Sequence, residues 1–272
     1  MKKLTIACLA LVILAIWLLW GNTALEVSTF VIEDEMIPSA FDGFRIAQVS
    51  DLHNAPFWEK VVTALEELEP DLIVLTGDLI DSSNTDVEAA LDFAEKAAEI
   101  APCYYVSGNH EAWSPGVWDD LRDGLTRAGV VLLEDEKVCL EREGESVTLL
   151  GLRDPAFGSD QHAVLEALMA GEEGFTVLLS HRPERFALYV QSGIDLVFSG
   201  HAHGGQFRVP VLGGVIAPDQ GFFPEYDGGL YEKKGTAMLV SRGIGNSIIP
   251  LRINNRPEII LAEWKVSVGI SE

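Results

Sequence analysis

The chain has little cysteine, little histidine and few basic residues. Its 272 residues include three cysteines, six histidines and 19 lysines and arginines, against 42 aspartates and glutamates. Three cysteines give no disulfide framework, so the fold must depend on a hydrophobic core. The formal net charge of −23 argues against nucleic acids and other polyanions as general partners, because like charges repel. A protein this acidic that handles a phosphate needs cations at its site.

The three cysteines are expected in two different environments. Cys8 falls in an apolar N-terminal run, whereas Cys103 and Cys139 fall in strand-like segments. Cysteine commonly packs as a small apolar residue, so we expect Cys103 and Cys139 in the core. A disulfide between these two is the alternative.

One long apolar run is present, at the N-terminus. Residues 4–20 carry no charge and follow Met1-Lys2-Lys3. This length reaches the lower limit for a membrane-spanning helix, about 17–25 residues, and the two lysines predict a cytoplasmic N-terminus. We therefore expect a single-pass signal-anchor over residues 1–22 that holds the following domain outside the cytoplasm, at the cell membrane. Secretion after cleavage of a signal peptide is the alternative.

Beyond this run, strand-like apolar segments alternate with amphipathic, acidic segments. This alternation is typical of an α/β sheet core with helices outside. No Pro/Ser-rich linker divides it, so a lead segment over residues 23–43 and one domain over 44–265 are expected. Strands are expected at residues 45–50, 71–77, 103–108, 147–152, 175–180 and 194–200, and helices at 58–69, 87–100, 117–128, 163–170 and 184–191.

Polar residues gather where the expected strands end, and five of the six histidines are among them. Ligands bind at the carboxyl ends of strands in open α/β sheets, so these residues are expected to form one site. The residues concerned are Asp51 and His53, Asp78 and Asp81, Asn109 and His110, His181, and finally His201 and His203.

These residue types fit divalent metal ions. Residues i and i+2 of an extended chain point to the same side, so Asp51 and His53 can reach one ion. Asp78 offers a carboxylate able to bridge two ions, and Asn109 offers a carbonyl oxygen. Mixed nitrogen and oxygen ligands favour Zn, Mn, Fe or Co over Mg or Ca. Two divalent transition-metal ions are therefore the expected cofactors.

The ordered blocks resemble the calcineurin-like metallophosphoesterases. The signature of that family, DxH, GDxxD, GNH[DE], a lone H and GHxH, is matched by residues 51–53, 77–81, 108–111, 181 and 200–203. The Gly-Gly-Gln continuation and the apolar N-terminus are similar to a bacterial membrane-anchored branch. The resemblance implies a four-layer α/β/β/α sandwich. It also implies that Asp51, His53 and His203 hold one ion, that Asn109, His181 and His201 hold the other, and that Asp78 bridges them.

The resemblance also implies the chemistry. A hydroxide shared by the two ions would attack phosphorus, while Asn109 and His110 contact the phosphate. His110 would act as general acid toward the leaving oxygen, oriented and charged by Asp81. Phosphoprotein phosphatases of this superfamily usually carry an arginine where Ser82 stands here, which counts against a protein substrate. Arg153 is a candidate substitute, and an ordinary ion-pair role for it is the alternative.

Two functions are consistent with the sequence. A phosphoesterase acting on a phosphomonoester or phosphodiester is favoured, because neither a ligand nor the acid histidine is missing. A metal-stabilised binding module at the cell surface is the alternative. Residues 207–231 are rich in glycine and aromatics; with the anchor they suggest a lipid-linked or envelope-derived phosphoester as the substrate. The alternative is that these aromatics only pack beneath a long loop.

Overall fold

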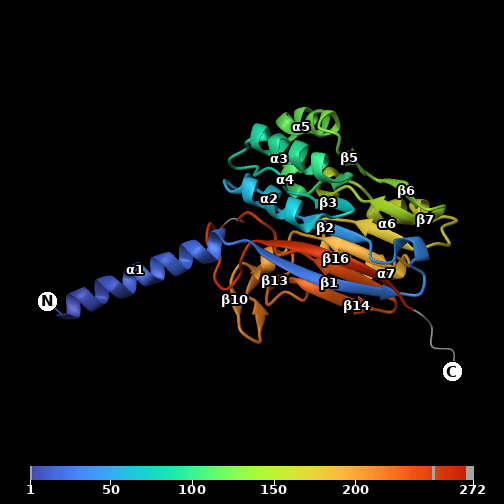
Figure 1. The fold of residues 1–272 in the computed structure, drawn as a ribbon. Coiled ribbons are helices and arrows are strands. Elements are labelled where there is room, and N and C mark those ends of the chain that lie inside the picture. The colour runs from blue at the N-terminus through green and yellow to red at the C-terminus, as the bar shows by residue number, and fades with distance from the viewer. Residues whose placement is uncertain (1, 247–248, 268–272) are drawn as a thin grey trace, which may run out of the picture.

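Two six-stranded sheets pack face to face and carry helices on their outer faces, in the order α/β/β/α (Figure 1). The computed structural model describes residues 2–246 and 249–267. The expected four-layer α/β fold is confirmed. Its first sheet has the strand order β1 (Glu26–Asp34), β16 (Glu258–Val266), β2 (Arg45–Val49), β3 (Leu72–Thr76), β4 (Cys103–Val106) and β5 (Val131–Leu132).

The second sheet is built in the same way. Its strand order is β14 (Gly229–Lys233), β15 (Thr236–Val240), β9 (Leu196–Ser199), β8 (Thr176–Leu179), β7 (Glu145–Gly151) and β6 (Glu136–Arg142). Strands β15, β9, β8 and β7 run parallel, as β2, β3, β4 and β5 do in the first sheet. The central strands are buried along their length, which explains why they read as continuous apolar runs.

Three apolar layers hold the sandwich together. Val74, Phe198 and Trp264 lie in the layer between the sheets. The outer face of the first sheet packs against α2 (Trp58–Leu68), α3 (Val87–Ile100) and α5 (Pro115–Arg127), and that of the second packs against α6 (Gln161–Leu168) and α7 (Phe186–Gln191).

Helix starts are visible in the sequence. The Asp86 side chain accepts a hydrogen bond from Ala89 N at the start of α3, and Asp160 caps α6 in the same way. Proline occupies the first position of α5. These are ordinary N-terminal signals, because they satisfy or remove free N–H groups.

Strands β1, β5 and β6 are among those that the sequence does not predict. Strand β1 lies in the expected lead segment and pairs with β16, and β5 and β6 form sheet edges. One cysteine prediction is wrong: Cys139 is exposed on edge strand β6, whereas Cys103 is buried as expected. Both are free thiols, so the alternative of a disulfide between them is also excluded. An edge strand has one face that no layer covers, which is why its cysteine can face solvent.

The N-terminal helix α1 (Lys2–Thr23) projects away from the domain (Figure 1). It has a mean hydropathy of 2.5 and none of its residues is buried; by length and composition it can cross a membrane. Strand β1 follows it directly and runs parallel to β16, which runs antiparallel to β2. The start of β1 and the end of β2 therefore lie at the same edge of the sheet, so α1 joins the domain at the edge where β2 delivers Asp51.

Candidate metal centre

The residues after the parallel strands meet at one edge of the sandwich. Six of the seven expected ligands form two buried groups with donor atoms within 4.8 Å of one another: Asp51, His53, Asp78 and His203 in one, and Asp78, His181 and His201 in the other. Asp78 belongs to both groups.

The backbone at these positions is unusual. Asp51, His53, Asp78, His201 and His203 all have φ between 44° and 64°, a left-handed region that non-glycine residues seldom adopt. Such conformations persist only where the surrounding structure imposes them, and they gather at functional sites. At Gly108 and Gly200 a Cβ would collide with Asp78 and with Ser50, respectively. The glycines of the blocks therefore allow the loops to approach the carboxylates.

In the first group the donor atoms face one another across a small space. Nε2 of His53 lies 3.2 Å from Nε2 of His203 and 3.5 Å from Oδ2 of Asp78. Nε2 of His203 lies 3.4 Å from Oδ1 of Asp51. One cation among these four atoms would contact two imidazoles and two carboxylates.

In the second group Oδ2 of Asp78 lies 3.2 Å from Nε2 of His181, which is 3.1 Å from Nδ1 of His201. Asn109 begins the short helix α4 (Asn109–Ala112). It directly follows Gly108, where a Cβ atom would collide with the Asp78 side chain. Oδ1 of Asn109 is buried and has no hydrogen-bond partner. A buried polar atom left in this way is costly, so the amide oxygen fits the role of a ligand to a cation.

The protonation of the histidines also fits cations. Burial lowers the pKa of His53 and of His201 to about 4, and lowers that of His203 well below its ordinary value. These three imidazoles are therefore neutral at pH 7, the form that binds metals. Burial also acts to lower the pKa of His181, but the charge and hydrogen bond of Asp78 outweigh it and raise the value to about 10. Without a bound cation, the extra proton on His181 supplies the positive charge that balances the Asp78 carboxylate.

His110 lies beside the first group without belonging to it. Its ring meets the ring of His53 edge-on, with centroids 4.4 Å apart. Its Nδ1 accepts a hydrogen bond from Ser82 N at 3.0 Å, which puts the proton of the neutral ring on Nε2. Oδ1 of Asp81 stands 3.8 Å from the same Nδ1 and accepts hydrogen bonds from Ser83 N and Oγ. Asp81 is thus near His110, but the direct contact comes from Ser82.

Comparison with known proteins agrees with this geometry. Residues 44–205 match the family model described as calcineurin-like phosphoesterase. The chain belongs to that family. It is 31% identical to the metallophosphoesterase YkuE of Bacillus subtilis (strain 168), over 89% of this chain and 86% of that protein. It is 30% identical to the phosphodiesterase YaeI of Escherichia coli (strain K12), over 81% of this chain and 82% of that protein.

Two further matches are a transmembrane relative and a solved structure. A Danio rerio transmembrane protein with a metallophosphoesterase domain is 31% identical over 92% of this chain and 61% of its own length. The crystal structure of TT1561 from Thermus thermophilus superposes with a TM-score of 0.51 at 14% identity, covering 74% of this chain and 90% of that one. The last match shows a shared fold alone.

Some residues of the site have no assigned role in the sequence interpretation. Glu111, at the end of the Gly-Asn-His-Glu block, accepts hydrogen bonds from the backbone N–H groups of Gly108, Asp78, Leu79 and Ile80 at 2.8–3.3 Å. It therefore ties the Asp78 loop to the Asn109 loop. Its place inside a recognised block is the signal that could have revealed it.

Asp219 and Arg182 also have no assigned role in the sequence interpretation, and both lie beside Nε2 of His201. Asp219 accepts a hydrogen bond from this nitrogen at 2.9 Å and another from Arg182. Arg182 is buried and also donates two hydrogen bonds to Asp154, from Nε at 2.5 Å and from Nη2 at 3.0 Å. Arg182 follows His181 directly, which is a usable signal, but Asp219 lies in the glycine-rich stretch where no pattern points to it.

Arg153 is held elsewhere. Its Nε donates to Glu134 at 3.0 Å, and its guanidinium stacks 5.4 Å from the Phe157 ring centroid. The ion-pair interpretation of Arg153 agrees with these contacts, and the arginine that touches the ligand cluster is Arg182.

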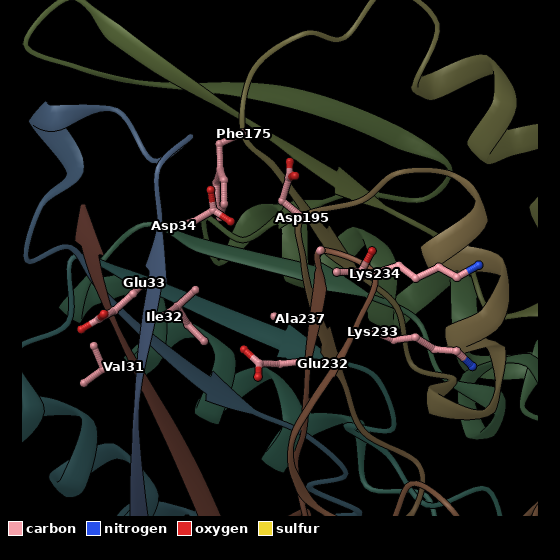
Figure 2. Close-up of a pocket in the computed structure, with 12 residues that line it drawn as sticks. Val31, Ile32, Glu33, Asp34, Phe175, Asp195, Glu232, Lys233, Lys234 and Ala237 are labelled. Atoms are coloured by element: carbon pink, nitrogen blue, oxygen red, sulfur yellow. The ribbon is translucent and has the colours of Figure 1, made fainter. Parts of the chain in front are cut away.

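A cavity of about 330 Å³ lies at the other end of the sandwich (Figure 2). Its lining includes Asp34 at the end of β1, Asp195 just before β9 and Thr236 at the start of β15. Because candidate ligands follow the opposite ends of β8 and β9, to which β15 runs parallel, this cavity is separate from the candidate metal centre.

Proposed function

We propose that the chain is a binuclear metal-dependent phosphoesterase, anchored in the cell membrane by α1 with its domain outside the cytoplasm. Family membership supports the hydrolase activity. The observation that carries the binuclear centre is the pair of buried ligand groups that share Asp78. Asp51, His53 and His203 would hold one divalent ion, and Asn109, His181 and His201 the other. Mn, Zn, Fe and Co fit this donor set.

Two bound ions would activate the attacking water and neutralise the phosphate oxygens. The remaining work falls to side chains of this chain. His110, beside the first group, would act from its doubly protonated form, giving its Nε2 proton to the leaving oxygen and keeping a proton on Nδ1, which lies 3.2 Å from Ser82 Oγ. Asn109 and His110 would contact the phosphate. Asp81, 3.8 Å from Nδ1 of His110, would stabilise the positive charge of a protonated ring.

The proposed substrate is a phosphoester with an apolar part, lipid-linked or derived from the envelope. Three observations support it: α1 joins the domain at the edge that carries the ligands, Trp113 is exposed, and its ring lies 5.2 Å from that of His110. The leaving group that His110 protonates would therefore lie against an exposed aromatic side chain close to the membrane.

The test uses the full chain in detergent, stripped of metal with a chelator and supplied with Mn, Zn, Fe or Co in turn. Hydrolysis of a chromogenic phosphodiester and of the matched monoester is followed at several pH values. Turnover that depends on the added ion is expected. A folded, metal-loaded protein that turns over neither ester with any of the four ions would instead be a binding module.

A further inference from the structure

We propose that two apolar hairpins beside the metal centre rest on the bilayer that holds α1, and so form a second membrane contact. The hairpins are β10 (Arg208–Val209) with β11 (Gly213–Gly214), and β12 (Ile216–Ala217) with β13 (Gly221–Phe222). We call them the hairpin rim, residues 208–223. The inference rests on the membrane part of the proposed function.

The rim carries exposed apolar side chains. Outside α1, and within the part of the chain that the structure describes, the four most exposed large apolar side chains are Val211, Phe222, Leu212 and Phe223, at 105%, 73%, 67% and 65%. Tyr226 and Tyr231, by contrast, pack against each other with ring centroids 5.1 Å apart. The aromatics after the histidine pair thus divide into a packed set and a set that faces outward.

The rim is tied to the end of α1 through residues 251–256. Asn22, at the end of α1, donates from Nδ2 to Arg252 O at 3.0 Å and accepts from Arg252 N at 2.7 Å. The guanidinium of Arg256 lies 4.8 Å from the Trp20 ring centroid and donates to Ala24 O at 3.0 Å. Residues 251–256 therefore hold the end of α1 against the domain.

The other side of this segment contacts the rim directly. Arg208 N donates to Ile253 O at 2.9 Å, and Phe207 and Ile253 form a β-bridge. Val215 N donates to Phe207 O at 2.8 Å just before the rim, and within the rim Phe223 N donates to Val215 O at 2.9 Å. Figure 1 shows β10 and β13 at the side of the domain from which α1 leaves.

A lipid surface fits this rim better than a protein partner does. Apolar α1, with Trp20 near its end, places a membrane interface beside these hairpins. Val211 and Leu212 lie in the turn of the first hairpin, and Phe222 and Phe223 lie at the end of β13 in the second. Two small apolar clusters of this kind suit shallow insertion among headgroups. In a chain of net charge −23, residues 209–218 carry no charge, so the first hairpin bears no acidic group that anionic lipids would repel.

The rim also carries a residue of the site. Asp219 stands between β12 and β13 and accepts the hydrogen bond from His201 at 2.9 Å. A bilayer in contact with Phe222 would therefore lie within a few residues of a side chain that touches the ligand cluster. This deepens the substrate assignment, since a phosphoester headgroup in the bilayer would be presented at the edge where the metals are expected.

The experiment places an environment-sensitive fluorophore on the rim of the full-length protein. Cys8→Ser and Cys139→Ser remove the exposed thiols, and Val211→Cys or Phe222→Cys supplies a single labelling site. Ser146→Cys is the matched control, because Ser146 is exposed near the start of β7, at the end of the sheet away from the ligands. Each protein is reconstituted in vesicles of phosphatidylcholine and phosphatidylglycerol, with and without a lipid-borne quencher.

We expect labels at 211 and 222 to emit at shorter wavelength and to be quenched several-fold more strongly by the lipid-borne quencher than the label at 146. Aqueous iodide should give the reverse order. If iodide quenches the labels at 211 and 222 as strongly as the label at 146, the proposed contact between the rim and the bilayer is wrong. Shielding from iodide without quenching from the lipid would mean that another protein covers these residues, and would also overturn it.

Two controls separate this proposal from the proposed function. Flotation of the protein with the vesicles reports whether α1 anchors it in the membrane. If the protein does not float, neither α1 nor the rim contacts the bilayer. Hydrolysis of a soluble phosphodiester by the same samples reports catalysis alone. Quenching in the expected order together with absent turnover would support the rim and count against the phosphoesterase.

Discussion

Asp219 accepts a hydrogen bond from Nε2 of His201 at 2.9 Å, while Nδ1 of the same ring faces His181 at 3.1 Å. The carboxylate thereby fixes the ring so that the unprotonated nitrogen points into the ligand group. Carboxylate partners of this kind orient metal-binding imidazoles, and their loss typically costs about 10- to 100-fold in metal affinity or activity.

We therefore expect Asp219→Asn to weaken binding of one of the two ions by about 10- to 100-fold. Titration with a metal-sensitive dye measures it. Glu225→Gln removes the same charge from an exposed residue just beyond β13 and should change nothing. Equal affinities for both variants would mean that Asp219 does not position His201.

His110 and His203 are expected to respond differently to substitution. His110→Asn should keep both metals and reduce turnover, because general acid catalysis typically contributes about 10²- to 10⁴-fold. His203→Ala should lose metal, since His203 faces both His53 and Asp51. Metal content by mass spectrometry and steady-state turnover decide the point. A stripped His110→Asn together with a fully loaded His203→Ala would reverse the two roles.

Stability without metal should depend on pH in a defined direction. The pKa of His181 is raised from 6.5 to about 10 in the folded chain. A raised pKa gives stability that is complete below pH 6.5 and is lost as pH rises toward 10, at up to about 1.4 kcal/mol per pH unit. The melting temperature of the chelator-treated protein should therefore fall between about pH 7 and 9. With metal bound, the ion replaces the proton and the fall should be much smaller. If the melting temperature of the metal-free His181→Asn variant falls with pH as steeply as that of the metal-free wild type, other groups cause the effect.

The domain is expected to work without its helix, provided that Asn22 is kept. Residues 21–272 retain both hydrogen bonds between Asn22 and Arg252, whereas residues 26–272 lose them. We expect the longer fragment to be soluble and to hydrolyse a water-soluble phosphodiester, and the shorter one to melt at a lower temperature. A folded but inactive longer fragment would mean that catalysis depends on α1 itself.

Much of the candidate site is predictable from the sequence because five buried strands, β2, β3, β4, β8 and β9, each end just before a candidate ligand. Strand β3 is apolar along its buried length, and Gly77 and Asp78 follow at once. Such runs have a clear pattern, and the carboxyl ends of parallel strands come together whatever the order of the strands. The sequence alone is therefore enough to place all five blocks on one edge.

The parts that the sequence does not predict are those without such a pattern. Strand β1 alternates between partly buried and exposed positions and bears acidic residues, so it resembles a polar linker until β16 pairs with it. The core position expected for Cys139 is wrong because it assumes two covered faces, and β6 has one. Asp219 lies 18 residues after His201 in the sequence. Neither motif spacing nor a periodic pattern in the sequence indicates that these two residues are in contact.

The central claim is most directly tested by a stoichiometric metal titration of the chelator-treated full chain, with Mn²⁺ or Zn²⁺ and a chromogenic phosphodiester. Asp78, which belongs to both ligand groups, should make the two ions act together. Turnover is expected to rise until two ions are bound per chain and then to stay level. Full turnover with one ion per chain, or none with two ions bound, would contradict the claim.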